Sequence, residues 1–175
     1  MTERQLIEAC LNHDRRAQHL LYERYCKAMY TIAYRITGDF ELAGETLQDA
    51  FLLVFRHLAN FEGRSTLGAW IKTIVVRTAV RKAERRPPLP DELDMRKDPG
   101  HIDWSGSGLD IEYLEKAILS LPDGYRAVFV LAEIEGYTHR EIGELLGISE
   151  GTSKSQLWGA KKKLQTMLRR TMAGE

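Results

Sequence analysis

The chain has 175 residues, with 25 basic and 25 acidic side chains and 43% hydrophobic residues. This length fits one domain or two small ones, and this composition is sufficient for packed cores. No apolar run approaches the ~18 residues that span a bilayer, and the N-terminus MTERQLIEAC lacks the apolar core of a signal peptide. We therefore expect a cytoplasmic protein without membrane insertion.

The first half of the sequence predicts four consecutive helices. The expected helices span about 3–11, 14–37, 39–60 and 66–86. Each follows a side chain that can accept a hydrogen bond from the free N–H groups of a helix start: Thr2, Asp14, Asp39, and Ser65 or Thr66. Since no run alternates in the manner of a strand, this half is predicted to be all helix.

Residues 87–110 predict a flexible linker. Pro87, Pro88 and Pro90 end the preceding helix, and the sequence that follows is acidic and poor in apolar residues. Basic side chains concentrate on either side: residues 72–86 contain six Lys or Arg, and so do residues 151–170. Two basic helices joined by an acidic connector suggest two contacts with a polyanion.

The second half predicts helices from about Asp110 and after Pro122, followed by a helix-turn-helix over 138–164. Thr138 and Glu141 form a capping box, and Gly147 stands where a helix end favours positive φ. Ser149 then caps the second helix, whose polar residues are expected to face outward: Thr152, Lys154, Ser155, Gln156, Trp158, Lys161, Lys162 and Lys163. Such a pair is a candidate reader of the DNA major groove, with an ordinary helix pair bearing a solvated basic face as the alternative.

One face of the third helix is acidic and edged with apolar residues. The residues on this face are Glu41, Glu45, Gln48, Asp49, Leu52 and Phe55. The like charges are four positions apart, which mildly destabilises an isolated helix. The pattern therefore favours a protein partner with a basic, partly apolar surface, and a plain solvated face is the alternative.

The fourth helix combines aromatic and basic side chains on one side. These are Trp70, Thr73, Arg77 and Arg81, preceded by a polar loop over 61–66 that contains Arg64, Ser65 and Thr66. Stacking an unpaired base and binding its phosphates requires such groups. The alternative places Trp70 in the core and leaves the arginines solvated.

The sequence contains no catalytic constellation, Gly-rich phosphate loop or cluster of metal ligands, so we expect neither an enzyme nor a cofactor. Cys10 and Cys26 are predicted to be buried, reduced thiols, since they form no CxxC motif.

Two stretches resemble one known family. ETLQDAFLLVFRHLANFEGRSTLGAWIKTIVVRTAVRKAERR resembles the second conserved region of bacterial RNA polymerase sigma factors, and LPDGYRAVFVLAEIEGYTHREIGELLGISEGTSKSQLWGAKKKL resembles the fourth. The short chain is similar to the extracytoplasmic-function (ECF) group. The resemblance implies an all-α fold with a region 2-like domain over 1–86, the linker over 87–110 and a region 4-like domain over 111–175.

The resemblance also implies partners and sites. Residues Glu41, Glu45, Gln48, Asp49, Leu52 and Phe55 would dock on the clamp of the largest polymerase subunit. A melted base of the minus-ten element would be held by Arg64, Ser65, Thr66, Trp70, Thr73, Arg77 and Arg81. The minus-thirty-five element would be read by Arg140, Ser149, Thr152, Lys154, Ser155, Gln156, Trp158, Lys161 and Lys162. Many relatives are also held by an anti-sigma protein, although no feature of this sequence identifies one.

The sequence departs from the family at several positions. Ser153 stands where Val is usual, Gln156 and Gly159 stand where basic residues are usual, and Arg77 replaces a frequent Asn. Two other functions remain open: a free-standing helix-turn-helix regulator, and a helical module that sequesters another protein.

Overall fold

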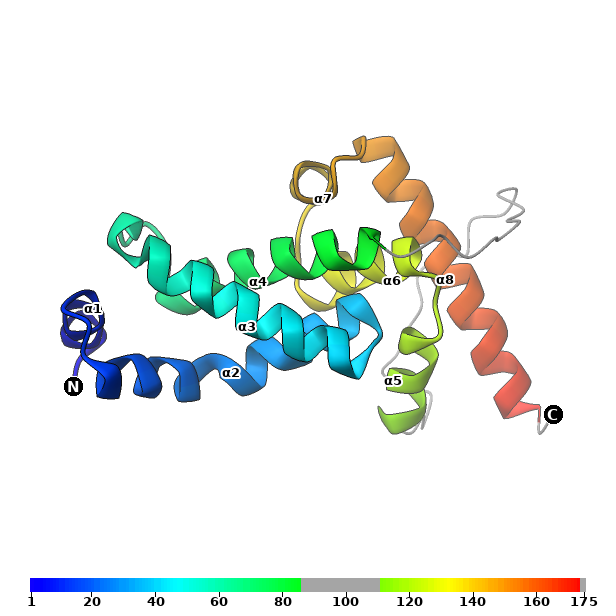
Figure 1. Cartoon of the computed structure of the whole chain (residues 1–175). Coiled ribbons are helices and arrows are strands. Elements are labelled where there is room, and N and C mark those ends of the chain that lie inside the picture. Colours follow the sequence, from blue (N-terminus) through cyan, green and yellow to red (C-terminus); the bar gives the residue numbers. More distant parts are fainter. Residues whose placement is uncertain (86–110, 174–175) are drawn as a thin grey trace. The chain divides into compact units, whose positions relative to one another are not determined.

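The computed structural model describes residues 1–85 and 111–173 and separates the chain into two compact units, with the boundary after Arg85 (Figure 1). Every regular element in these two ranges is helical, which confirms the predicted all-α fold. The predicted linker over 87–110 lies outside the described residues. Among the helices of the described ranges, none combines the length and the hydropathy that crossing a bilayer requires.

The first unit consists of four α-helices and one short 3-10 turn. These are α1 (Glu3–Leu11), α2 (Arg15–Thr37), α3 (Phe40–His57), the 3-10 turn (Leu58–Asn60) and α4 (Leu67–Glu84). The predicted caps are present at Thr2, Asp14 and Asp39. Of the two candidates for α4, Thr66 is the cap, because its Oγ1 accepts a hydrogen bond from Ala69 N at 3.2 Å.

The core of the first unit lies between α2, α3 and α4, which pack against one another in all three pairs, while α1 packs on α2. Its buried side chains include Leu21, Ile36, Leu47, Phe51, Val54, Leu58, Leu67, Ile71 and Val75. From Leu47 to Leu58 and from Leu67 to Val75 they recur three or four positions apart, which is the spacing that places apolar groups on one helical face. Leu47, Phe51 and Val54 therefore form the inner face of α3.

The second unit is organised around its last helix. Its elements are α5 (Ile111–Leu119), α6 (Asp123–Phe129), a π-helical turn (Val130–Ile134), α7 (His139–Leu146) and α8 (Glu150–Met172). Helix α8 contacts α5, α6 and α7, and the core includes Ile118, Leu121, Val128, Phe129, Leu131, Ile142, Ala160 and Leu164.

Two features between α5 and α7 were not predicted. The π-helical turn continues α6, and Glu135 N donates to Val130 O at 2.9 Å, five residues back. Arg126 is only 3% exposed, and its Nη1 donates to Leu119 O at 3.2 Å and to Leu121 O at 2.8 Å. Because the last carbonyls of a helix lack partners within it, Arg126 caps the end of α5.

The two cysteines differ in their surroundings. Both are free thiols, but only Cys10 is buried, and Cys26 is half-buried, so the prediction of a buried Cys26 is wrong. Burial raises the pKa of the Cys10 thiol, and the nearby Asp14 carboxylate raises it further. Both effects disfavour the reactive thiolate of Cys10.

Candidate functional site

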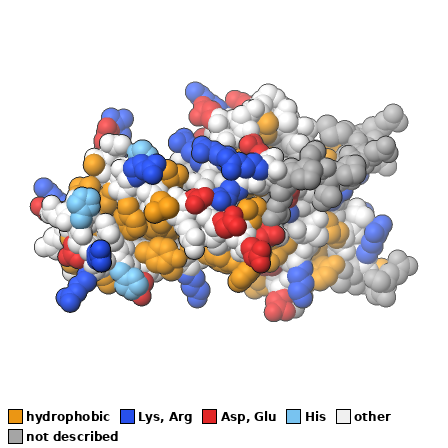
Figure 2. All heavy atoms as spheres, viewed as in Figure 1, with side chains coloured by type: hydrophobic (Ala, Val, Ile, Leu, Met, Phe, Trp, Pro, Cys, Tyr) orange, Lys and Arg blue, Asp and Glu red, His pale blue; other side chains and the backbone are white. Residues whose placement is uncertain are grey.

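The predicted acidic face of α3 is exposed in the structure. Glu41, Glu45, Gln48 and Asp49 are all exposed, as is Leu52 at 65%. Figure 2 shows acidic side chains over the first half of α3 and a hydrophobic area over its second half. Phe55 is half-buried against Phe51, with ring centroids 6.2 Å apart, and Phe40 adds a 73% exposed ring at the start of the helix.

Lys82 of α4 pairs with this acidic face, which was not predicted. Its Nζ lies 2.8 Å from Asp49 Oδ2 and 3.5 Å from Glu45 Oε2. The hydrogen bond to Asp49 is the main reason why the pKa of the Lys82 ammonium is raised above its usual value. Lys82 follows the buried residues Val75 and Thr78 of α4 at helical spacing, so extending the inward face of that helix by one turn would have placed it next to α3.

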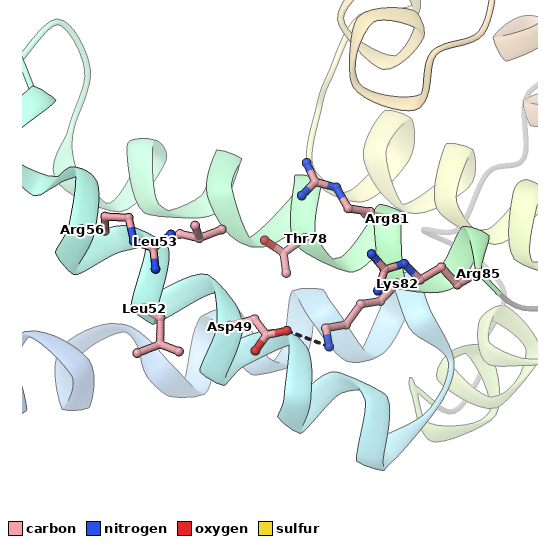
Figure 3. A pocket seen from close by; sticks show the side chains of 8 residues that line it. All are labelled: Asp49, Leu52, Leu53, Arg56, Thr78, Arg81, Lys82 and Arg85. Atoms are coloured by element: carbon pink, nitrogen blue, oxygen red, sulfur yellow. Dashed lines mark ion pairs between the residues drawn. The ribbon is translucent and has the colours of Figure 1, made fainter.

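A groove of about 260 Å³ lies between α3 and α4 (Figure 3). It is lined by Asp49, Leu52, Leu53, Arg56, Thr78, Arg81, Lys82 and Arg85. Asp49 and Leu52 belong to the predicted protein-binding face, and Arg81 belongs to the predicted nucleic-acid-binding helix. The two predicted surfaces are thus neighbours within one unit.

Trp70 is half-buried, so it is neither sealed in the core nor fully free. Its ring lies against that of Phe61, with centroids 5.5 Å apart and planes tilted by 54°. Thr73 is half-buried and its Oγ1 donates to Ala69 O at 3.1 Å, whereas Arg77 and Arg81 are exposed. Helix α4 therefore carries an aromatic side chain near its start and two exposed cationic side chains two and three turns further along.

The loop before α4 is open to solvent. Ser65 and Thr66 are exposed, and Gly63 has the positive φ of +70° that favours glycine. The Arg64 side chain is 86% exposed, and its Nε lies 2.6 Å from Glu62 Oε2. Part of the positive charge expected from Arg64 is therefore already balanced within the loop.

The helix-turn-helix has the predicted local geometry. Thr138 and Glu141 form the capping box, and Gly147 ends α7 with φ of +67°. Ser149 Oγ accepts from Thr152 N at 3.0 Å. The turn also brings two backbones together at Gly143, where a Cβ would lie 2.7 Å from Ile148 O.

Most of the predicted DNA-binding residues of the second unit reach its surface. Arg140, Ser149, Thr152 and Lys154 are exposed, and Ser155, Trp158, Lys162 and Lys163 are half-buried. Arg140 Nε lies 3.5 Å from Glu144 Oε1 on the same helix. Lys162 Nζ lies 4.9 Å from the centroid of the Trp158 ring, so a cation–π contact holds both side chains on α8.

Two residues of α8 do not face outward as predicted. The Gln156 Oε1 atom is buried against Gly124 and has no hydrogen-bond partner among the described residues. The Lys161 side chain is only 18% exposed, and its Nζ lies 2.8 Å from Glu133 Oε1 in the π-helical turn. Both side chains therefore point toward α6 and the turn after it, and not toward solvent.

Ser153 replaces an apolar contact with a polar one. The residue is fully buried, and its Oγ lies 2.8 Å from His139 Nδ1 at the start of α7. The Ser153 hydroxyl thus joins the two helices of the helix-turn-helix by a hydrogen bond.

Comparisons with known proteins agree with this architecture. Residues 21–86 match the family model of sigma-70 region 2, and residues 111–164 match that of sigma-70 region 4. The RNA polymerase sigma-H factor of Pseudomonas aeruginosa is 28% identical, over 95% of this chain and 96% of that protein. The ECF RNA polymerase sigma-E factor of Escherichia coli strain K12 is 26% identical, over 97% and 98%.

Two solved structures share the fold. The sigma factor RpoE in complex with the anti-sigma factor NepR from Bartonella quintana has a TM-score of 0.56 at 21% identity, over 86% of this chain and 96% of that one. CnrH in complex with the cytosolic domain of CnrY has a TM-score of 0.56 at 20% identity, over 96% and 97%. The two family models, in their order along the chain, and the named relatives confirm the resemblance seen in the sequence: the chain belongs to the sigma-70 family, as an RNA polymerase sigma factor of the ECF group.

Proposed function

We propose that the first unit binds core RNA polymerase through the exposed face of α3. The observation that carries this proposal is the combination of exposed carboxylates and an exposed leucine on one helix face, at Glu45, Asp49 and Leu52. Glu41, Gln48 and Phe55 extend the same face. A basic, partly apolar surface complements it, and we propose that this surface is the clamp of the largest subunit, as the resemblance implies.

The same unit then captures an unpaired base of the minus-ten element. Trp70 and Phe61 offer an aromatic surface for stacking, and Arg77 and Arg81 offer charge for the adjoining phosphates. Thr73 and the loop residues Arg64, Ser65 and Thr66 border this surface. Unstacking a base costs a few kcal/mol, which the contacts with the protein offset.

The second unit reads the minus-thirty-five element with α8 and the turn before it. We assign the contacts to Arg140, Ser149, Thr152, Lys154, Ser155, Trp158 and Lys162. We leave out Gln156, whose Oε1 atom is buried within the unit, and Lys161, whose ammonium is paired with Glu133. Two weak DNA contacts on one chain gain avidity when the spacing between the promoter elements allows both. The domain roles thus follow the predicted limits 1–86 and 111–175.

An anti-sigma factor is a further partner in this proposal. Its support is the likeness in fold to RpoE, which was solved in complex with the anti-sigma factor NepR. Family membership and the acidic face of α3 together favour the sigma-factor function over a free-standing regulator or a sequestering module.

In-vitro transcription with core polymerase tests the proposed function. We expect Trp70→Ala to abolish promoter opening while polymerase binding survives, and Asp49→Lys to weaken polymerase binding itself. Permanganate footprinting reports opening, and fluorescence anisotropy of labelled protein reports binding. If Trp70→Ala forms open complexes normally, the base-capture role is wrong, and if Asp49→Lys keeps the wild-type affinity, polymerase docks elsewhere.

A further inference from the structure

Lys82 connects the two proposed surfaces of the first unit. It extends from α4, which also carries the arginines proposed to bind DNA, and its ammonium contacts Asp49 on α3 (Figure 3). The ammonium also lies 3.5 Å from Glu45 Oε2 on the same helix. The side chains of Asp49 and Glu45 are 53% and 64% exposed, whereas that of Lys82 is 17% exposed. A cation of a binding partner can therefore reach the two carboxylates from solvent and compete with Lys82 for them.

Three other cationic side chains line the groove, so the Lys82 ammonium can move next to them only together with an anion. Arg56, Arg81 and Arg85 line the same groove, and among the described residues none of the three forms an ion pair with a carboxylate. Adding an ammonium beside them raises their mutual repulsion unless an anion is present. The phosphates of a nucleic acid strand are such anions, and Arg81 already belongs to the surface proposed to bind them.

We propose that Lys82 couples polymerase binding to promoter binding by exchanging its anionic partners. This inference rests on the proposed function. In the free protein Lys82 neutralises part of the docking face, so a cation of the polymerase surface must compete with it for Asp49 and Glu45. Once displaced, the ammonium is available to a phosphate of the promoter strand beside Arg81.

The exchange makes the two binding events mutually favourable. Polymerase binding raises the affinity for promoter DNA, and DNA must then raise the affinity for polymerase by the same factor. Because the carboxylates are solvent-exposed, the contribution of Lys82 is that of an exposed ion pair. We expect a factor of about two to five.

The test compares Lys82→Gln with Lys27→Gln, which removes the same charge from an exposed position on α2. The affinity of each full-length variant for core polymerase is measured with and without promoter DNA that carries an unpaired minus-ten strand. Without DNA, we expect Lys82→Gln to bind core polymerase about two- to fivefold more tightly than the wild type does. Promoter DNA should then increase the affinity of this variant for core polymerase less than it does for the wild type, by the same factor. Lys27→Gln should match the wild type in both, and Lys82→Arg should retain the coupling.

Two results overturn the inference. One is a Lys82→Gln variant whose DNA-induced gain equals that of the wild type, and the other is a variant that binds core alone no more tightly. A purely structural Lys82 would give the first result together with a lower melting temperature.

Asp49→Asn separates this inference from the docking proposal. If Asp49→Asn leaves the core affinity unchanged, the docking face itself is wrong. If it weakens core binding while Lys82→Gln leaves the coupling intact, only the role of Lys82 is wrong.

Discussion

Gly143, in the middle of α7, is the position where the helix-turn-helix has the least room, and we predict that Gly143→Ala destabilises the second unit. The new Cβ would lie 2.7 Å from Ile148 O, a backbone atom that cannot rotate away. Ile148 N also donates to Gly143 O at 3.1 Å, so the two backbones cannot separate without stretching this bond. Forcing extra atoms into such a contact costs about 1–3 kcal/mol, and a weakened hydrogen bond costs about 1 kcal/mol more.

Helix propensity opposes this cost, since alanine is about 1 kcal/mol better than glycine inside a helix. The free energy of unfolding should therefore fall by about 1–3 kcal/mol. In a domain of this size, each kcal/mol lowers the melting temperature by about 4–8 °C. Thermal unfolding followed by circular dichroism measures it, with hydrogen exchange of the α7 and α8 amides to assign the transition.

Gly151→Ala is the matched control for this prediction. A Cβ at Gly151 would meet its nearest neighbour, Ser149 Oγ, at 3.8 Å, which is ordinary van der Waals contact. Alanine there should stabilise the unit by about 0.5–1 kcal/mol. If Gly143→Ala is stabilised to the same degree, the close approach does not constrain the turn.

Three further predictions concern protonation and charge. Because burial raises the pKa of Cys10, iodoacetamide at neutral pH should modify Cys26 first and Cys10 only after unfolding, as peptide mass spectrometry would show; equal rates would contradict this. The hydrogen bond from the Thr138 backbone N–H at the helix cap lowers the pKa of Glu141. Its stabilising effect is therefore present above the pKa of the unfolded state and is lost as the pH falls through the folded pKa. The free energy of unfolding of the wild type should therefore fall toward that of Glu141→Gln on acidification, and a constant difference would exclude this role. Lys162→Gln should reduce the salt dependence of DNA binding by about one counterion, whereas Lys161→Gln should leave the slope unchanged, because its ammonium is paired with a carboxylate.

The helices and their caps could be predicted because their causes are local. The capping boxes at Thr2 and Thr138 each depend on residues three positions apart, and the chain ends α2 and α7 at Gly38 and Gly147 with φ of +67°. The exposure of the α3 carboxylates also follows from spacing, since a 3.6-residue period assigns each position to a face.

The contacts between helices could not be predicted in this way. The pairs Lys82–Asp49, Lys161–Glu133 and Ser153–His139 each join elements whose crossing is determined by the whole core. The prediction that Gln156 faces solvent was wrong for the same reason. Helical spacing gives the direction in which a side chain leaves α8, but it does not say that α6 lies there. A lysine four positions after an inward threonine was a usable signal for Lys82, whereas no local signal distinguishes Lys161 from Lys162.

The π-helical turn over Val130–Ile134 has a consequence for how the length of this chain can vary. Closing a loop five residues back accommodates one residue more than a regular α-helical turn. Deleting a single residue there would leave a regular α-helical turn, and the chain after it would keep nearly the same direction, because the extra residue is contained within the π-helical turn. A deletion inside α8 would instead rotate the residues after it by about 100° and turn their side chains toward a different direction. Variants with a one-residue gap at Val130–Ile134 should therefore fold without compensating changes elsewhere in the unit, whereas the same gap inside α8 should require them.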